Sequence, residues 1–206
     1  MNIFDFFGSA VCHQIAERSF ILGEETLPVC ARCTGIYSGV FFSMLFFVIF
    51  GRLNGNKPYA TLAMIIGACS FIPISIDGFF SYAGFWESNQ FLRMVTGTFA
   101  GVCLPGFMIL GANFDVIGDN NRPIYKSASE ELLLILVTLL WGILIWLHFG
   151  NYFLVSVVIV GGIICFWTNF LYLIIKNLAG KRDWHCWRLA FCTGMIFILS
   201  IGVLRL

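Results

Sequence analysis

The longest uncharged stretch of the chain is residues 132–175, LLLILVTLLWGILIWLHFGNYFLVSVVIVGGIICFWTNFLYLII. It contains no Asp, Glu, Lys or Arg. A helix needs about 20 apolar residues to cross a bilayer, so this stretch is long enough for two crossings and too long for one. We therefore predict two membrane spans, near 131–148 and 152–175, separated by a break at the His-Phe-Gly-Asn sequence of residues 148–151.

Four further apolar segments predict four more spans. They lie near residues 31–50, 58–79, 93–113 and 188–205. The composition agrees with a membrane protein, because 59% of the 206 residues are hydrophobic and only 11% are charged. The predicted fold is all-α: a polytopic bundle of about six transmembrane helices that forms a single membrane domain over residues 1–206.

The distribution of charge predicts the orientation in the membrane. The formal net charge is +1, and no basic run exceeds Lys181-Arg182, so we expect the lipid bilayer and no nucleic acid as partner. The first, third and fifth loops carry most of the Lys and Arg residues, and the side of the termini carries only Arg18, Arg32, Arg93 and Arg205. The positive-inside rule then places both termini outside the cytoplasm, in a cell (inner) membrane.

The segment of residues 1–29 is too polar to span the membrane. Its apolar residues Ile3, Phe7, Val11 and Ile15 recur at helical spacing, which favours an amphipathic helix in the membrane interface. The segment also contains Cys12 and His13, and it leads directly into Cys30 and Cys33 at the start of the first span.

These four residues form a candidate metal site. Thiolate and imidazole ligands suit Zn(II), and the C-x2-C spacing of Cys30 and Cys33 is common in zinc sites. Adjacent residues diverge by about 100° on a helix, so Cys12 and His13 can both bind only if the backbone turns between them; three protein ligands and an open position are an alternative. A structural disulfide and a reactive dithiol pair at Cys30 and Cys33 are the other interpretations.

A second set of polar residues is expected on the same face. Asp77 ends the second span and Arg93 begins the third, and a carboxylate near hydrocarbon needs a partner, for which Arg93 is the expected one. Together with Glu87 they form either an interfacial ion-pair network or a catalytic pocket beside the metal. Pro73 predicts a kink one turn before Asp77.

Two small-residue motifs favour close contact between spans one and three. The first comprises Gly35 and Gly39, and the second comprises Gly97 and Gly101. Glycines four residues apart let two helix backbones approach closely. Packing alone explains both motifs.

Several strings resemble a prokaryotic family of predicted membrane proteins, the domain of unknown function number 2085. They are C-H-Q from residue 12, R-S-F from 18, L-P-V-C-A-R-C-T-G-I-Y from 27, D-G from 77 and N-Q-F-L-R-M-V-T-G from 89. The resemblance covers roughly residues 10–101. The resemblance supports the candidate site at the cysteines, and it implies no particular reaction.

The sequence thus predicts an integral membrane protein with an extracytoplasmic zinc site beside a mouth lined by Asp77, Glu87 and Arg93. A metal-dependent enzyme acting on a lipid-linked or small-molecule substrate is one hypothesis. A membrane thiol-disulfide oxidoreductase that uses Cys30 and Cys33 is a second. A structural or transport protein with a structural metal or disulfide is a third, and the oligomeric state is left open.

Overall fold

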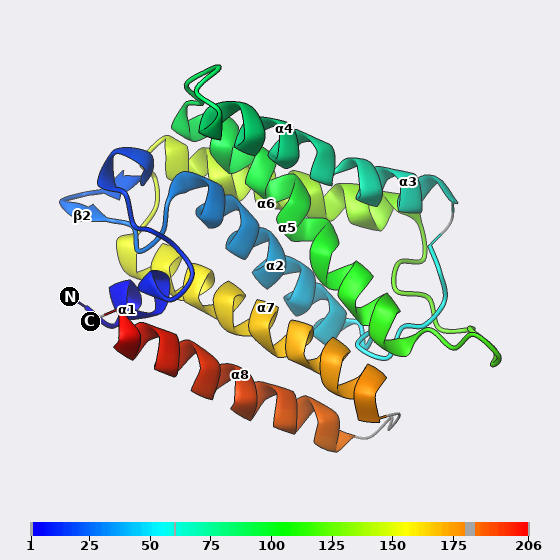
Figure 1. Cartoon of the computed structure of the whole chain (residues 1–206). Coiled ribbons are helices and arrows are strands. Elements are labelled where there is room, and N and C mark those ends of the chain that lie inside the picture. Colours follow the sequence, from blue (N-terminus) through cyan, green and yellow to red (C-terminus); the bar gives the residue numbers. More distant parts are fainter. Residues whose placement is uncertain (1, 60, 180–183, 206) are drawn as a thin grey trace.

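The computed structural model describes residues 2–59, 61–179 and 184–205. Almost all of it is helical (Figure 1), and six helical segments are long and apolar enough to cross a membrane, with the two successive helices of Thr61–Tyr82 counted as one. The elements follow in the order α1 (Ile3–Ser9), a 3₁₀ turn (Ala16–Arg18), β1 (Ile21–Leu22), β2 (Glu25–Thr26), α2 (Ala31–Ile49), α3 (Thr61–Cys69), α4 (Phe71–Tyr82), α5 (Gln90–Asn113), α6 (Ala128–Trp146), α7 (Tyr152–Ala179) and α8 (Trp184–Leu204). The predicted all-α bundle of about six spans is confirmed. The basic residues Lys181 and Arg182, counted for the orientation, lie outside the described residues.

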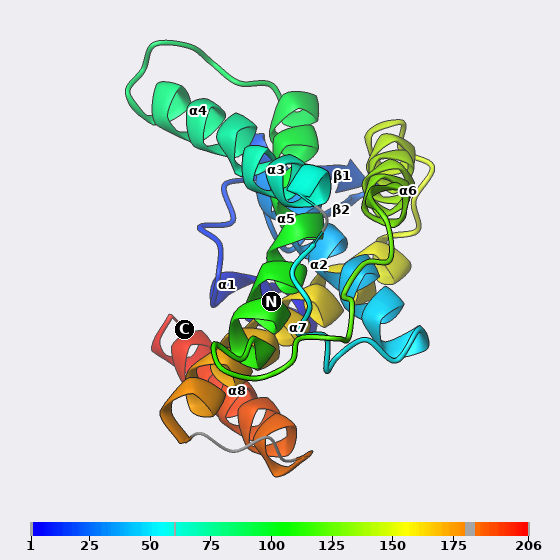
Figure 2. The same cartoon turned by 90° about the vertical axis from the view of Figure 1, so that its right-hand side faces the viewer.

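Helices α2 and α5 form the centre of the bundle (Figure 1). Helix α7 packs against both of them, whereas α4 packs on α5 and α8 packs on α7. Figure 2 shows α4 and α8 at opposite edges of the bundle. Large apolar side chains are exposed along the outer helices, for example Phe79 of α4, Leu133 of α6 and Ile196 of α8, as expected for surfaces that face lipid.

Four glycines bring α2 and α5 into backbone contact. A Cβ atom at Gly35 would lie 2.2 Å from the carbonyl oxygen of Met94, and one at Gly97 would lie 2.3 Å from that of Arg32. A Cβ at Gly101 would lie 2.2 Å from the carbonyl oxygen of Ile36. Side chains of any size are therefore excluded at these positions. The predicted close packing of spans one and three is confirmed.

The second span is divided into α3 and α4 at Ser70. Pro73 has no N–H to donate to the carbonyl of Cys69, and its ring crowds that carbonyl. The irregularity therefore falls at the preceding turn, three residues before the proline. The break at Ser70 is thus about one turn earlier than the kink expected one turn before Asp77, and α4 runs on to the N-terminal end of α5.

The N-terminal segment forms a small folded unit over one end of the bundle. We call residues 2–30 the cap, this end the cap end, and the opposite end the loop end. The predicted amphipathic helix is shorter than its apolar pattern indicates, because α1 stops at Ser9. The backbone then turns, with a positive φ of 52° at Gln14, and continues into the hairpin β1–β2, in which Ile21 pairs with Thr26 and Leu22 with Glu25.

Hydrogen bonds attach the cap to several spans. His148 Nδ1, in the turn between α6 and α7, lies 2.8 Å from the carbonyl oxygen of Ile21. Gln90 of α5 donates to the carbonyl of Ser19 at 3.1 Å. Arg205, just after α8, donates to the carbonyl of Ser9 at 2.6 Å and to that of Cys12 at 3.3 Å. The cap is therefore held at a fixed position on the bundle.

Candidate metal centre and adjoining cavity

The cap places Cys12 against the first turn of α2. Gly8 of α1 lies so close to Pro28 that a Cβ atom there would be 2.0 Å from the Pro28 carbonyl oxygen. The Gln14 side chain donates to the carbonyls of both Asp5 and Pro28, at 2.8 and 3.0 Å. These contacts fix the segment that leads into Cys30, which occupies the N-cap position of α2.

The three cysteines converge at this point. The sulfur atoms of Cys12, Cys30 and Cys33 all lie within 4.8 Å of one another, and all three thiols are free. Cys12 is buried, and its sulfur accepts a hydrogen bond from the backbone N–H of Cys30 at 3.3 Å. Hydrogen bonds from the thiols of Cys30 and Cys33 hold the pKa of Cys12 well below its usual range. The bond to Cys12 in turn raises the pKa of Cys30.

His13 lies outside this cluster. Its side chain is exposed, whereas Cys12, its neighbour in the chain, is buried. The backbone leaves α1 before this point, so Cys12 and His13 do not have to follow helical geometry. Even so, they point to different surroundings. The cluster that could hold a metal consists of the three sulfur atoms.

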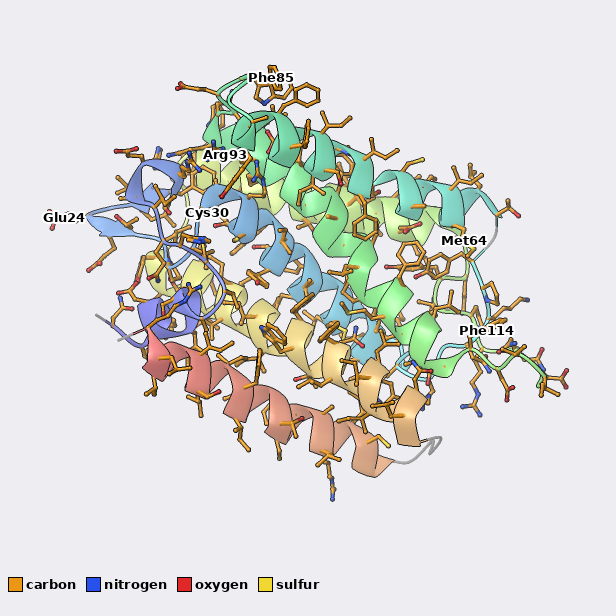
Figure 3. All side chains as sticks on the ribbon, viewed as in Figure 1. Glu24, Cys30, Met64, Phe85, Arg93 and Phe114 are labelled. Carbon is orange, nitrogen blue, oxygen red and sulfur yellow. The ribbon has the colours of Figure 1, made fainter. Side chains whose placement is uncertain are left out.

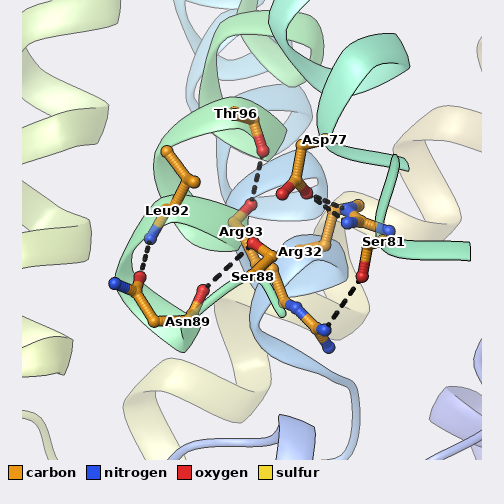
Figure 4. A network of polar contacts seen from close by, with 8 residues as sticks. All are labelled: Arg32, Asp77, Ser81, Ser88, Asn89, Leu92, Arg93 and Thr96. Carbon is orange, nitrogen blue, oxygen red and sulfur yellow. Dashed lines mark hydrogen bonds and ion pairs between the residues drawn. The ribbon is translucent and has the colours of Figure 1, made fainter. Parts of the chain in front are cut away.

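Asp77 pairs with Arg32 of α2 and not with Arg93 (Figure 4). The Asp77 carboxylate is 1% exposed, and its Oδ2 atom accepts from Nε of Arg32 at 3.0 Å and also from Nη2. The expected Asp77–Arg93 ion pair is therefore wrong. Arg32 lies between Cys30 and Cys33 in the sequence. Its side chain reaches from the first turn of α2 to Asp77 in the C-terminal half of α4.

Arg93 lies beside this pair and is mostly buried. Its Nη2 atom donates to the Ser81 hydroxyl at 3.3 Å, and its Nε has no hydrogen-bond partner among the described residues. It interacts electrostatically with Arg18, Arg32, Asp77 and Cys30. Figure 3 shows Arg93 and Cys30 at the same end of the bundle, far from Met64 and Phe114. Three arginines therefore converge next to the cysteine cluster.

A cavity of about 550 Å³ opens on Arg93. It is lined by residues of the cap, of the end of α4, of the following connection and of the start of α5: Glu17, Arg18, Ser81, Gly84, Trp86, Glu87, Ser88, Asn89, Gln90 and Arg93. Two of the three residues predicted for the mouth, Glu87 and Arg93, thus share one cavity. Asp77 does not line it, and its contact is with Arg32. Arg18 was not predicted as a site residue, and it reaches the cavity through the fold of the cap.

The architecture defines a class: a six-span membrane protein with a folded cap that carries a thiol cluster. A family model described as "Predicted membrane protein (DUF2085)" matches residues 12–107, which include every residue proposed above for the site. An uncharacterized protein of Methanocaldococcus jannaschii is 36% identical over 113 residues, which cover 53% of this chain and 67% of the relative. An uncharacterized protein of Methanothermobacter thermautotrophicus is 37% identical over 94 residues, which cover 46% and 80%. No solved structure matches the chain significantly. The chain belongs to the DUF2085 family of predicted membrane proteins.

Proposed function

We propose that Cys12, Cys30 and Cys33 bind a divalent metal ion, with zinc as the best candidate. The observation that supports this most strongly is the mutual approach of three free sulfur atoms within 4.8 Å. Zn–S bonds of about 2.3 Å in tetrahedral geometry place the sulfurs roughly 3.8 Å apart. The cluster is thus close to the size of a three-thiolate site. His13 lies outside the sulfur cluster in this structure, and we propose it as the fourth ligand after its exposed side chain turns toward Cys12.

We propose further that the cavity that opens on Arg93, at the same end of the bundle as the cysteines, binds an anionic group. Arg18 and Arg93 line it, and Arg32 approaches the same region from α2. Guanidinium groups suit phosphate and carboxylate groups, which they bind through paired hydrogen bonds. Because the cavity lies at the ends of membrane spans, a lipid-linked or small-molecule anion is the proposed substrate. In this hypothesis Arg93 and Arg18 bind the anion, and Asp77 positions Arg32.

A metal bound at the cysteines would supply a Lewis acid, able to polarise a substrate oxygen or to activate water. Glu87, which lines the cavity with Arg93, is the candidate for moving a proton there. We propose that these features belong to a metal-dependent membrane enzyme. By the positive-inside rule, the site faces the extracytoplasmic side of the cell membrane.

A thiol-disulfide oxidoreductase is the second candidate function. The close approach of Cys30 and Cys33, and the depressed pKa of Cys12, suit thiol exchange. A disulfide, however, would use only two of the three converging sulfurs. The third sulfur favours a metal, because a thiol-exchange pair does not require it. A structural role for the same metal, or for a disulfide, is a third alternative.

Serine variants test the ligand set. We expect Cys12→Ser, Cys30→Ser and Cys33→Ser each to reduce bound zinc from about one ion per chain to near zero, since each removes one thiolate. His13→Ala is expected to weaken zinc affinity and still allow saturation at high zinc. Elemental analysis of the detergent-purified proteins measures this.

The matched control is Cys69→Ser, because Cys69 is a free, exposed cysteine on α3. It should retain the zinc content of the wild type. Retention of stoichiometric zinc by any of the three cluster variants would remove that cysteine from the ligand set. The oxidoreductase would be supported by a different result: a wild-type protein that contains no metal and oxidises its dithiol reversibly, with this oxidation lost in a folded Cys30→Ser or Cys33→Ser variant.

A further inference from the structure

A carboxyl group is buried in the bundle far from the cysteine cluster. Glu131 of α6 is 0% exposed, and its carboxyl oxygens have no hydrogen-bond partner among the described residues other than a weak contact with the Cys103 thiol. The preceding residue, Glu130, points elsewhere and forms an ion pair with Arg52, at 2.7 Å between Oε2 and Nη1. Arg52 is therefore already neutralised by a different carboxylate.

Glu131 reaches into the membrane-spanning part of the fold. A Cβ atom on Gly67 of α3 would lie 3.1 Å from Oε1 of Glu131. Gly67 follows the first residue of α3 by six positions, which corresponds to about 9 Å along the helix. The titratable groups that face Glu131 are Tyr59, Cys103 and Tyr125, and all three are neutral in their ordinary state.

These surroundings are unsuited to a bare negative charge. An ionised carboxylate without a partner in an apolar interior is costly, and such groups take up a proton or a cation instead. A carboxyl group that carries a proton is neutral and needs no basic partner. Among the described residues, no Lys or Arg side chain pairs with Glu131. This favours the protonated acid.

A cavity at the loop end is lined by two residues that interact with this group, Tyr59 and Tyr125. Its volume is about 420 Å³, and it is lined by Lys57, Pro58, Tyr59, Pro123, Tyr125 and Lys126. The rings of Tyr59 and Tyr125 lie 5.3 Å apart between centroids, and both hydroxyls are buried without a hydrogen-bond partner among the described residues. A phenol can accept and donate a hydrogen bond at once. Both tyrosines line the cavity, and both also interact electrostatically with the buried acid.

We propose that Glu131 is a proton-binding site of the membrane interior, which exchanges protons with the loop end through Tyr59 and Tyr125. A hydronium ion in the cavity gives a proton to a phenol oxygen and becomes water. In the part of the chain that the structure describes, no hydrogen bond joins a tyrosine hydroxyl to Glu131, so the phenol's own hydrogen passes to a bridging water. This water gives one of its hydrogens to the Glu131 carboxylate and leaves a neutral acid. The phenol is unchanged at the end, and the reverse sequence releases the proton. This site is independent of the metal centre at the cap end.

Infrared difference spectroscopy of the full chain in lipid tests this proposal. We expect a carboxylic-acid C=O band in wild-type protein that disappears on titration from about pH 5 to about pH 9 and shifts in D₂O. The band should be absent from Glu131→Gln, which is close in shape to the neutral acid and should fold normally. Glu24→Gln, which changes an exposed carboxyl in the cap hairpin, should keep the band.

The tyrosine variants test the exchange route. Tyr59→Phe and Tyr125→Phe should keep the band and slow its hydrogen–deuterium exchange by about tenfold or more. Exchange at the wild-type rate in both variants would contradict the route. Persistence of the band in Glu131→Gln would contradict the site. A band that appears only when sodium and potassium are replaced by choline would also contradict it, since a metal cation would then occupy Glu131.

Discussion

Replacing Gly101 with alanine is expected to destabilise the protein severely. The new methyl group would lie 2.2 Å from the carbonyl oxygen of Ile36, so α2 and α5 would have to separate. These two helices form the centre of the bundle, and overpacking of a tight core costs about 1–3 kcal/mol, with larger values where the backbone itself must move. We expect a large decrease in the thermal unfolding midpoint in detergent, together with a low yield of folded protein.

Gly78→Ala is the matched control for this substitution. Gly78 lies in α4, and a Cβ atom there would have nothing within 4 Å. Alanine favours helix more than glycine does, so the control should keep or slightly increase the stability. Equal unfolding midpoints for the two variants would contradict the close packing of α2 on α5.

Replacing Asp77 with alanine is expected to have the second large effect. Asp77 is 1% exposed and binds the Arg32 guanidinium, which would lose its only ion-pair partner in the described part of the chain. Removing one partner of a buried ion pair costs on the order of 3 kcal/mol. We expect a lower free energy of unfolding, measured by denaturation in mixed micelles, and weaker attachment of α4 to α2.

The double variant Arg32→Ala, Asp77→Ala distinguishes the ion pair from general loss of packing. The double variant contains no guanidinium left without its ion-pair partner, so it should be more stable than Asp77→Ala alone. Arg93→Ala provides the comparison, because Arg93 forms no ion pair with Asp77. Additive effects of the Arg32 and Asp77 substitutions would show that the two side chains do not interact energetically.

Much of the fold follows from the sequence because long apolar runs have few alternatives. The span of residues 131–148 was expected and α6 covers Ala128–Trp146, since the membrane fixes the length of such a helix. The glycine motifs predicted the α2–α5 contact, because glycines four residues apart let two helix backbones approach closely. The cap was not predictable from periodicity. Its apolar residues follow a helical spacing, but tertiary contacts at Pro28 and Gln14 end α1 at Ser9.

The site was predicted in part, for reasons of geometry. Cys30 and Cys33 lie on one turn, so their proximity could be expected, and Cys12 joins them through the fold of the cap. The partner of Asp77 was misassigned because Arg93 is nearer in sequence, whereas Arg32 is nearer in space. The burial of the Glu131 side chain was not predicted from the sequence. Glu131 stands at the edge of an uncharged run, and only the packing of α3 and α5 against α6 buries it.

Elemental analysis of wild-type protein, purified in detergent without chelators, tests the central claim most directly. A thiol titration of the same sample after denaturation should accompany it. The metal site predicts about one zinc ion per chain, with Cys12, Cys30 and Cys33 all reduced. Protein without stoichiometric metal and with Cys30 oxidised would contradict the claim.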